Sequence, residues 1–475
     1  MAYETLLQER RRALHARIVE ALEVLAGDRV AEQVERLAHH ALRGEVWDKA
    51  LAYFRQAGEK AMTRSAHREA VEYFEQALGA LSQLPETRHT REQAIDLRLA
   101  LRSALAPSGH SGRILAYLRE AETLAVTLDD PRRLGQVSFF LSLHFRNRGT
   151  YDQAIAAGQR ALVLATADGD VVLHALANLY LGLAYHAQGG YRRAVDCFGQ
   201  TVVFFDEARH RERFGQVFLP AVQSRFWLAS CHAELGTFAE GSAFGEEGLQ
   251  IAEAVDHPGS LMAAYWGSGL LSLRQGGLHR ALPRLERAVS ICQEADLPVY
   301  FPWMAAALGA AYILGGRVAD AVSLLTQAME QAIATERVVY QGLCSLPLGE
   351  AHLQAGRLEE AHTLTERALA LAREHQERGT QAYALRVLGE IAARCEPPES
   401  QQAETNYQQA IALANELSMR PLQAHCHLGL GLFHLKIGRE VQARPELSAA
   451  IALYRAMDMT FWLPQAEAAL AEAEG

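Results

Sequence analysis

Proline and cysteine are both scarce in this chain. Only 14 of its 475 residues are proline, and the abundant Ala, Leu, Glu, Gln and Arg lose little side-chain freedom on a helix. The six cysteines form no CxxC pair, so we expect neither a zinc framework nor a disulfide scaffold. Together these features predict a helical protein of a reducing compartment, the cytoplasm.

An excess of basic residues and a long apolar run are also lacking. The chain holds 46 Lys and Arg against 56 Asp and Glu, a formal net charge of −10. This balance argues against general nucleic-acid binding, which needs cationic side chains to displace counterions. No run of about 18 apolar residues occurs, and the N-terminal sequence has no signal-peptide core. We therefore expect neither a nucleic acid nor a membrane as partner.

Motifs of catalysis are missing as well. The sequence contains no GxxxxGK[ST] phosphate loop, no HExxH and no GxSxG. The neighbours His39 and His40, and likewise His425 and His427, lie one or two residues apart. On a helix such pairs point to different faces and cannot close on one ion. We predict no catalytic residue, no cofactor and no metal site, and hence no enzyme.

What is present is a repeat of about 40 residues. Its most regular column is a glycine, seven residues after a small residue that usually follows Leu, and five residues before an alanine. Each unit predicts two helices joined at the glycine, with the small residue and the alanine facing each other so that the helix axes approach closely. The glycines are Gly109, Gly149, Gly189, Gly236, Gly276, Gly316, Gly356 and Gly438.

These columns resemble the tetratricopeptide repeat in a lengthened form. The resemblance implies an all-α, right-handed superhelical solenoid of antiparallel helix hairpins, with about nine repeats over residues 91–457. Because one hairpin cannot bury its apolar face alone, neighbours must stack and the array needs a cap. We expect residues 458–475 to form that cap, and residues 1–90 to form a helical segment outside the period.

The N-terminal segment carries a second resemblance. The stretch VERLAHHALRGEVWDKALAYFRQAGEKA is similar to the junction between the ATPase module and the repeats in bacterial signalling ATPases of the STAND class. It is also similar to the same junction in class III nucleotide cyclase–ATPase–repeat fusions. The resemblance implies that this chain is the sensor part, with an ATPase or cyclase domain as a partner on its N-terminal side. The basic run Arg10–Arg12 fits a solvated helix face or a contact with an acidic neighbouring domain.

The first helix of each hairpin is expected to line the concave face, which is where we predict binding. Apolar and aromatic residues recur there, whereas Glu350, Arg386 and Glu390 occupy the equivalent positions further on. The alternative is that these aromatics pack between hairpins as core. Gly241 and Gly248 replace packing alanines nearby, which we expect to soften that unit. The candidate groove residues are Phe139, Leu179, Leu183, Phe226, Trp266, Leu270 and Trp303.

The function that these observations favour is a non-catalytic binding module. A protein segment or a small ligand would occupy the groove, and the family resemblance adds a regulatory role beside a nucleotide-dependent ATPase or cyclase. The alternative is a free-standing scaffold that bridges two partners.

Overall fold

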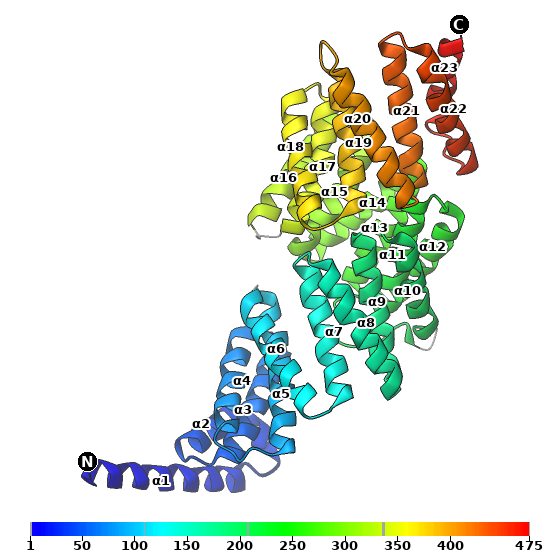
Figure 1. Cartoon of the computed structure of the whole chain (residues 1–475). Helices are drawn as coiled ribbons and strands as arrows, with labels where there is room; N and C mark the ends of the chain where they lie inside the picture. The colour runs from blue at the N-terminus through cyan, green and yellow to red at the C-terminus, as the bar shows by residue number, and fades with distance from the viewer. Residues whose placement is uncertain (1, 109, 207–208, 335–337, 475) are drawn as a thin grey trace. The chain divides into compact units, whose positions relative to one another are not determined.

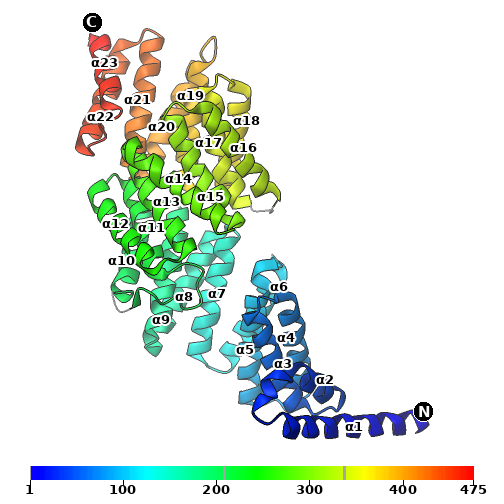
Figure 2. The same ribbon diagram turned by 180° about the vertical axis from the view of Figure 1, so that it is seen from behind.

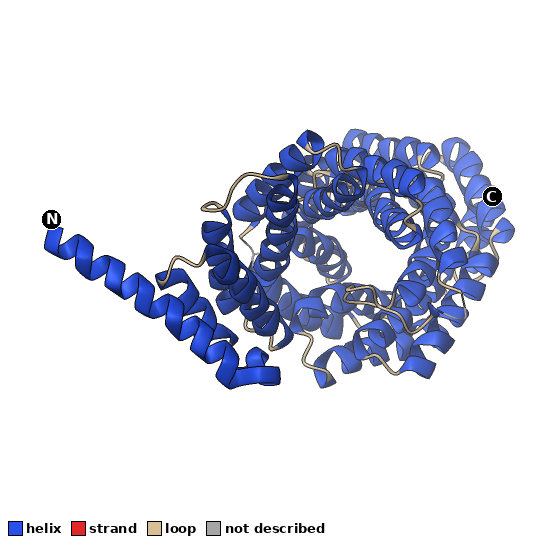
Figure 3. Cartoon of the chain, turned by 90° about the horizontal axis from the view of Figure 1, so that it is seen from below, coloured by secondary structure: helices blue, strands red, loops and turns tan. Residues whose placement is uncertain are grey.

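The computed structural model of the chain describes residues 2–108, 110–206, 209–334 and 338–474. Over these ranges the fold consists of helices joined by turns and loops, and no strand occurs in them (Figures 1 and 3). The predicted all-α solenoid of antiparallel hairpins is confirmed. No helix in the described ranges is both long enough and apolar enough to cross a bilayer.

The chain consists of two compact units. The first consists of Met1–Asn147 with Ala156–His174, and the expected boundary at residue 90 lies inside it. Its elements are α1 (Ala2–Ala26), η1 (Gly27–Glu32), α2 (Val34–Arg43), α3 (Trp47–Thr63), α4 (His67–Leu81), α5 (Arg88–Leu105), η2 (Ala106–Ser108), α6 (Ser111–Thr127), α7 (Pro131–Asn147) and most of α8 (Tyr151–Asp168).

The second unit consists of Arg148–Ile155 with Ala175–Gly475. Its elements are most of α9 (Val171–Ala187), then α10 (Tyr191–Phe204), α11 (Pro220–Leu235), α12 (Phe238–Val255), α13 (Pro258–Gln275), α14 (Leu278–Glu294), η4 (Pro298–Tyr300), α15 (Phe301–Leu314), α16 (Val318–Ala334), α17 (Val338–Gln354), α18 (Leu358–Glu374), α19 (Arg378–Arg394), α20 (Ser400–Glu416), α21 (Arg420–Lys436), α22 (Glu440–Ala456) and α23 (Leu463–Glu474).

The first helices of successive hairpins pack against one another in the second unit. Helix α11 contacts α13, α13 contacts α15, and the series continues through α17, α19 and α21. This packing places the first helices on the inner side of the stack, as in other helical-repeat arrays. Helix α23 packs on α22 and extends the core beyond the last hairpin (Figure 2).

The glycine at each hairpin turn has the left-handed backbone that the repeat predicts. The φ angle is +75° at Gly236 and +88° at Gly276, a region that residues with a Cβ enter only at a cost. The remaining described members of the column, Gly149, Gly189, Gly316, Gly356 and Gly438, also have positive φ. Gly109 lies outside the described residues.

The small residue before the turn has a different partner from the one we expected. A Cβ added to Gly309 would lie 2.6 Å from Leu325 Cγ, and one added to Gly182 would lie 2.6 Å from the Phe198 ring. At these two positions the small residue lies nearest a large side chain of the second helix, whereas the Cβ of Gly349 would lie 2.7 Å from Thr365 Oγ1 and 3.2 Å from the carbonyl oxygen of Ala361, the alanine after the turn. The close approach of the two helices requires glycine because the bulky side chain occupies the space of a Cβ.

This packing predicts opposite effects for two glycine-to-alanine substitutions in helices. We expect Gly309→Ala to lower the free energy of unfolding by about 1–3 kcal/mol, because Leu325 would have to move. Gly199, in α10, has no atom within 4 Å of an added Cβ, so Gly199→Ala is expected to raise stability by roughly 0.5–1 kcal/mol. Urea unfolding of both variants measures the two changes in unfolding free energy. Equal changes would show that the space for a Cβ at Gly309 is not restricted.

Hairpins far apart in the sequence also meet within the second unit. Helix α11 contacts α21, five hairpins further on (Figure 1). At the adjoining turns, a Cβ on Gly236 would lie 2.3 Å from Met457 Sδ, and one on Gly276 would lie 2.6 Å from Phe461 Cβ. The solenoid thus returns onto itself, so the ends of the early hairpins rest on those of the late ones.

Candidate functional site

Three neighbouring first helices carry the candidate site. Helix α11 begins at Pro220 and α13 begins at Pro258, where the fixed φ of proline and its missing N–H suit the first helical turn. The His257 side chain caps α13 by accepting a hydrogen bond from the Ser260 backbone N–H. Helix α15 begins at Phe301, directly after η4. All three helices belong to the second unit.

Most of the predicted groove residues are buried in the hairpin stack. Phe226 is only 1% exposed and Trp266 only 5% exposed. Leu270 and Trp303 are partly exposed and pack against the same core. Phe139, Leu179 and Leu183 are buried as well, and Phe139 lies in the first unit.

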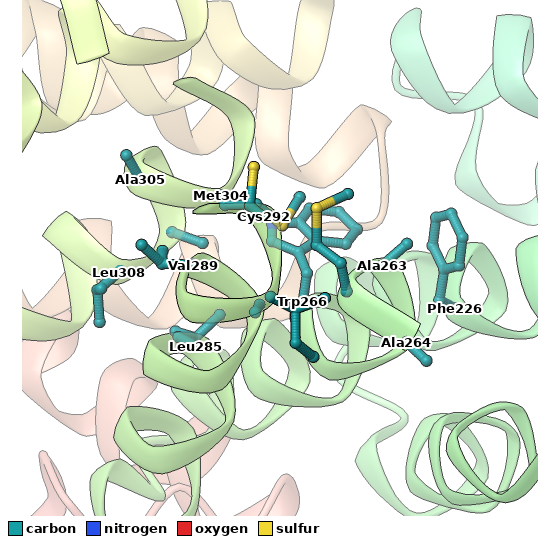
Figure 4. Packing of buried hydrophobic residues seen from close by; sticks show 14 of the residues in the cluster. Phe226, Ala263, Ala264, Trp266, Leu285, Val289, Cys292, Met304, Ala305 and Leu308 are labelled. Atoms are coloured by element: carbon teal, nitrogen blue, oxygen red, sulfur yellow. The ribbon is translucent and has the colours of Figure 1, made fainter. Parts of the chain in front are cut away.

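The surroundings of Trp266 explain its burial. Figure 4 shows Trp266 close to Met304 and Cys292, and the Phe226 ring meets the indole edge-on, with ring centroids 6.0 Å apart. The Trp266 Nε1 atom is buried and has no hydrogen-bond partner. Buried polar atoms are nearly always paired, so this N–H marks an imperfectly satisfied place in the core. Trp266 can shape a binding surface from beneath but does not itself present one.

A tryptophan that the sequence columns did not single out extends the partly exposed surface. Trp227 on α11 is partly exposed and stacks nearly parallel to Trp303, with ring centroids 5.9 Å apart and an interplanar angle of 12°. The His186 ring meets Trp227 edge-on at 4.6 Å, and Trp303 also contacts Trp266 at 4.6 Å. Trp227 directly follows the predicted groove residue Phe226 on α11, so a search of the neighbouring face of that helix would have found it.

Charged residues lie at the C-terminal ends of α11 and α13. Glu234 lies at the end of α11 and Arg274 at the end of α13, and Arg274 Nε donates a hydrogen bond to Glu234 Oε1 (3.1 Å). Tyr383 Oη, from α19, donates to Glu234 Oε2 (2.7 Å). The Arg274 guanidinium also lies 4.4 Å from the centre of the Tyr383 ring, a cation–π distance. Burial raises the pKa of Tyr383 well above its ordinary value, so its hydroxyl remains a donor.

The charged positions predicted near residues 350 to 390 are paired with one another. Arg386 Nη1 donates to Glu390 Oε2 (3.1 Å), and the same guanidinium also donates to Glu350. All three side chains are partly exposed, and their opposite charges offset one another. This group therefore presents a polar surface with charges of both signs, and not a surface of one charge.

Gly241 and Gly248, in the hairpin formed by α11 and α12, lie where the helices pack closely. A Cβ on Gly241 would lie 2.6 Å from Leu271 Cδ1, and one on Gly248 would lie 3.0 Å from Arg225 Cβ. Both positions bring α12 close to its neighbours, so the structure corrects the expectation that they loosen this unit.

The cysteine thiols described next are buried, and the two histidines are paired with neighbouring side chains. Burial raises the pKa of Cys292 to about 11 and that of Cys426 to about 12, so both stay protonated at neutral pH. His427 Nδ1 pairs with Glu446 Oε2 (2.6 Å), whereas His425 Nδ1 lies 2.9 Å from Tyr454 Oη. Among the described residues, no group of three His, Cys, Asp or Glu is placed to hold a metal ion.

No protein-family model and no curated protein matches the sequence. A solved structure of a Rap protein complexed with Competence and Sporulation Factor is similar at 16% identity and a TM-score of 0.59, over 78% of this chain and 99% of that chain. A STAND protein with a tetratricopeptide repeat sensor from Pyrococcus horikoshii is similar at 15% identity and a TM-score of 0.43, over 80% of this chain and 54% of that one.

The apo quorum sensor NprR from B. thuringiensis is similar at 13% identity, over 78% of this chain and 99% of that chain, with a TM-score of 0.47. Similarity at this level of identity concerns the fold. The helices, the turn glycines and the Rap comparison together define the class: the chain is a tetratricopeptide-like helical-repeat array.

Proposed function

We propose that this chain is a non-catalytic binding module that takes up a protein segment on the inner face of α11, α13 and α15. The observation that carries the proposal is the stacked pair of partly exposed tryptophans, Trp227 and Trp303, beside Leu270. Tryptophan is among the residues that most often anchor an interface. The Rap structure of similar fold is itself a complex with a second molecule, which supports a binding role for such an array.

A second surface, on helix α1, is suited to contact with a neighbouring domain on the N-terminal side. Helix α1 carries four of the thirteen exposed large apolar side chains among the described residues: Leu7, Leu14, Val24 and Leu25, with Val24 84% exposed. Arg10 and Arg17 lie on the same side of the helix and make no ion pair within the described residues. Leu7, Leu14 and Leu25 form an exposed apolar stripe, and the two arginines lie along one side of it. Such a surface fits a partner with an apolar patch bordered by carboxylates.

The partner that the family resemblance implies for α1 is an ATPase or cyclase domain, which would make the array its sensor. A scaffold that bridges two partners would use the same two surfaces. The two functions are distinguished by whether the protein that binds α1 also binds a nucleotide. Retention of that partner by the full chain, and its loss in a Leu14→Asp variant, would support the sensor if the partner hydrolyses or cyclises a nucleotide.

The inner-face site is tested with a peptide selected from a random library on the folded chain. We expect Trp303→Ala and Trp227→Ala each to weaken its binding by about 30-fold, the effect of losing an anchor worth about 2 kcal/mol. Phe244 is a partly exposed aromatic residue on the second helix α12, outside α11, α13 and α15, so Phe244→Ala serves as the matched control and should bind normally. Binding that all three substitutions leave unchanged would show that the inner face is not the site.

A further inference from the structure

The carboxylate of Glu234, on α11, joins its own helix to the neighbouring α13 and to α19, which is remote in the sequence. Its two oxygens accept hydrogen bonds from Arg274 on α13 and from Tyr383 on α19. Glu234 and Arg274 lie on neighbouring first helices, whereas 149 residues separate Glu234 from Tyr383. One of the two hydrogen bonds thus lies within the early hairpins, and the other joins early hairpins to late ones.

Other contacts between early and late hairpins surround this group. Tyr151 Oη donates to Glu377 Oε1 (2.9 Å). A Cβ on Gly379 would lie 2.2 Å from Tyr191 Oη, so α19 begins directly against the start of α10. The turn glycines reflect the same division: Gly236 and Gly276 meet atoms of late hairpins, whereas Gly316 and Gly356 have nothing within 4 Å of an added Cβ.

We propose that Glu234, Arg274 and Tyr383 form a latch that holds the solenoid of the second unit closed upon itself, and that this closure can be released. The proposal concerns the free chain and does not rest on the proposed function.

The arrangement of the charges makes release feasible. When α19 moves away, Glu234 loses the Tyr383 hydroxyl but keeps its ion pair with Arg274, because these two residues stay on adjacent helices. No buried charge is left without a partner, which is the situation that makes breaking a buried ion pair so costly. Release costs the Tyr383–Glu234 hydrogen bond and the cation–π contact, together with the Tyr151–Glu377 hydrogen bond and the contacts at the turns.

Closure also decides which inner surfaces face one another. Helix α11 carries Trp227 as well as Glu234, and α19 carries Arg386 and Glu390 as well as Tyr383. In the closed state the latch holds the polar helix α19 against the ends of the aromatic helices. Glu234, Arg274 and Tyr383 are therefore positioning residues, and a segment that touches both surfaces would favour closure through its differential affinity.

The latch is tested by measuring the distance between Glu240 on α12 and Gln408 on α20, both exposed. Spin labels are attached through unnatural amino acids so that the native cysteines are untouched, and double electron–electron resonance gives the distance distribution. We expect Tyr383→Leu to add a longer-distance population that is several-fold larger than in the wild type. Tyr383→Phe, which keeps the ring over Arg274, should lie between the two.

Tyr265→Phe is the matched control, because Tyr265 Oη donates to Glu253 Oε1 (3.0 Å) between adjacent helices of the same unit. It should leave the distances unchanged. If Tyr383→Leu does not fold, Glu234→Gln weakens the same hydrogen bonds with little change in volume and is expected to open the solenoid partially. A folded latch variant with the wild-type distance distribution, even one with a lower melting temperature, would overturn the proposal.

Discussion

Substitution of Phe226 by Ala is expected to lower the free energy of unfolding by about 3–5 kcal/mol. Its ring is 1% exposed and contacts Trp266 at 6.0 Å and Phe218 at 6.3 Å between ring centroids. Removing the ring leaves a cavity between α11 and α13, and a packed core closes such cavities only in part. Urea unfolding followed by circular dichroism measures the loss.

The matched variant is Trp227→Ala, one residue further along α11. Because Trp227 is partly exposed, its truncation removes less buried area, and we expect a smaller loss of stability but a larger loss of peptide binding. This reciprocal pattern separates the core residues of the aromatic cluster from those that present a surface. Equal stability losses in the two variants would show that both rings are core residues.

The second large effect is a loss of stability at acidic pH that His425 causes. Burial, with Arg386 and Arg274 nearby, lowers the pKa of His425 from 6.5 to about 3. The folded protein favours the neutral ring, so the stabilisation is fully present above pH 6.5 and is lost as the pH falls from 6.5 toward 3. At pH 4.5 the loss amounts to about 2–3 kcal/mol, from 1.36 kcal/mol per pH unit.

A His425→Gln variant removes this titration. We expect its unfolding free energy to change less between pH 7 and pH 4.5 than that of the wild type, by about the same 2–3 kcal/mol. His89 is exposed, and His89→Gln is the control that should retain the wild-type pH dependence. If His425→Gln also retained it, the ring would be accessible to protons in the folded state.

The local architecture could be predicted from the sequence because it repeats. The turn glycines have the left-handed backbone that their spacing required, as at Gly236 and Gly276. The glycines of the small-residue column mark places where the two helices leave no room for a Cβ, as at Gly309, where Leu325 occupies that space. Each of these features depends on residues within one hairpin, where sequence spacing determines contact.

The site was harder to predict because it depends on small rotations about each helix axis. Phe226 and Trp227 are adjacent, yet one is core and the other is partly exposed. The repeat pattern places both residues on a first helix, but it does not show which of the two faces the core of the stack. Trp303, also predicted from its column, remains partly exposed and stays a candidate.

The contacts between early and late hairpins could not be predicted from the repeat pattern. Tyr383 and Glu234 occupy unrelated columns, and their hydrogen bond follows from the way many hairpins accumulate curvature. Small errors in each hairpin angle add along a solenoid, so sequence spacing does not fix where the chain returns. The charged residues therefore looked remote from the aromatic helices, although the structure joins them at Glu234.

The most direct test of the central claim is amide hydrogen exchange of the full chain with and without the selected peptide. The account predicts that bound peptide slows exchange along the first helices α11, α13 and α15, while the second helices α12, α14 and α16 stay unchanged. Such slowing is expected because a ligand suppresses local opening of the segments that it contacts. Protection confined to the second helices, or to α1, would contradict an inner-face binding site.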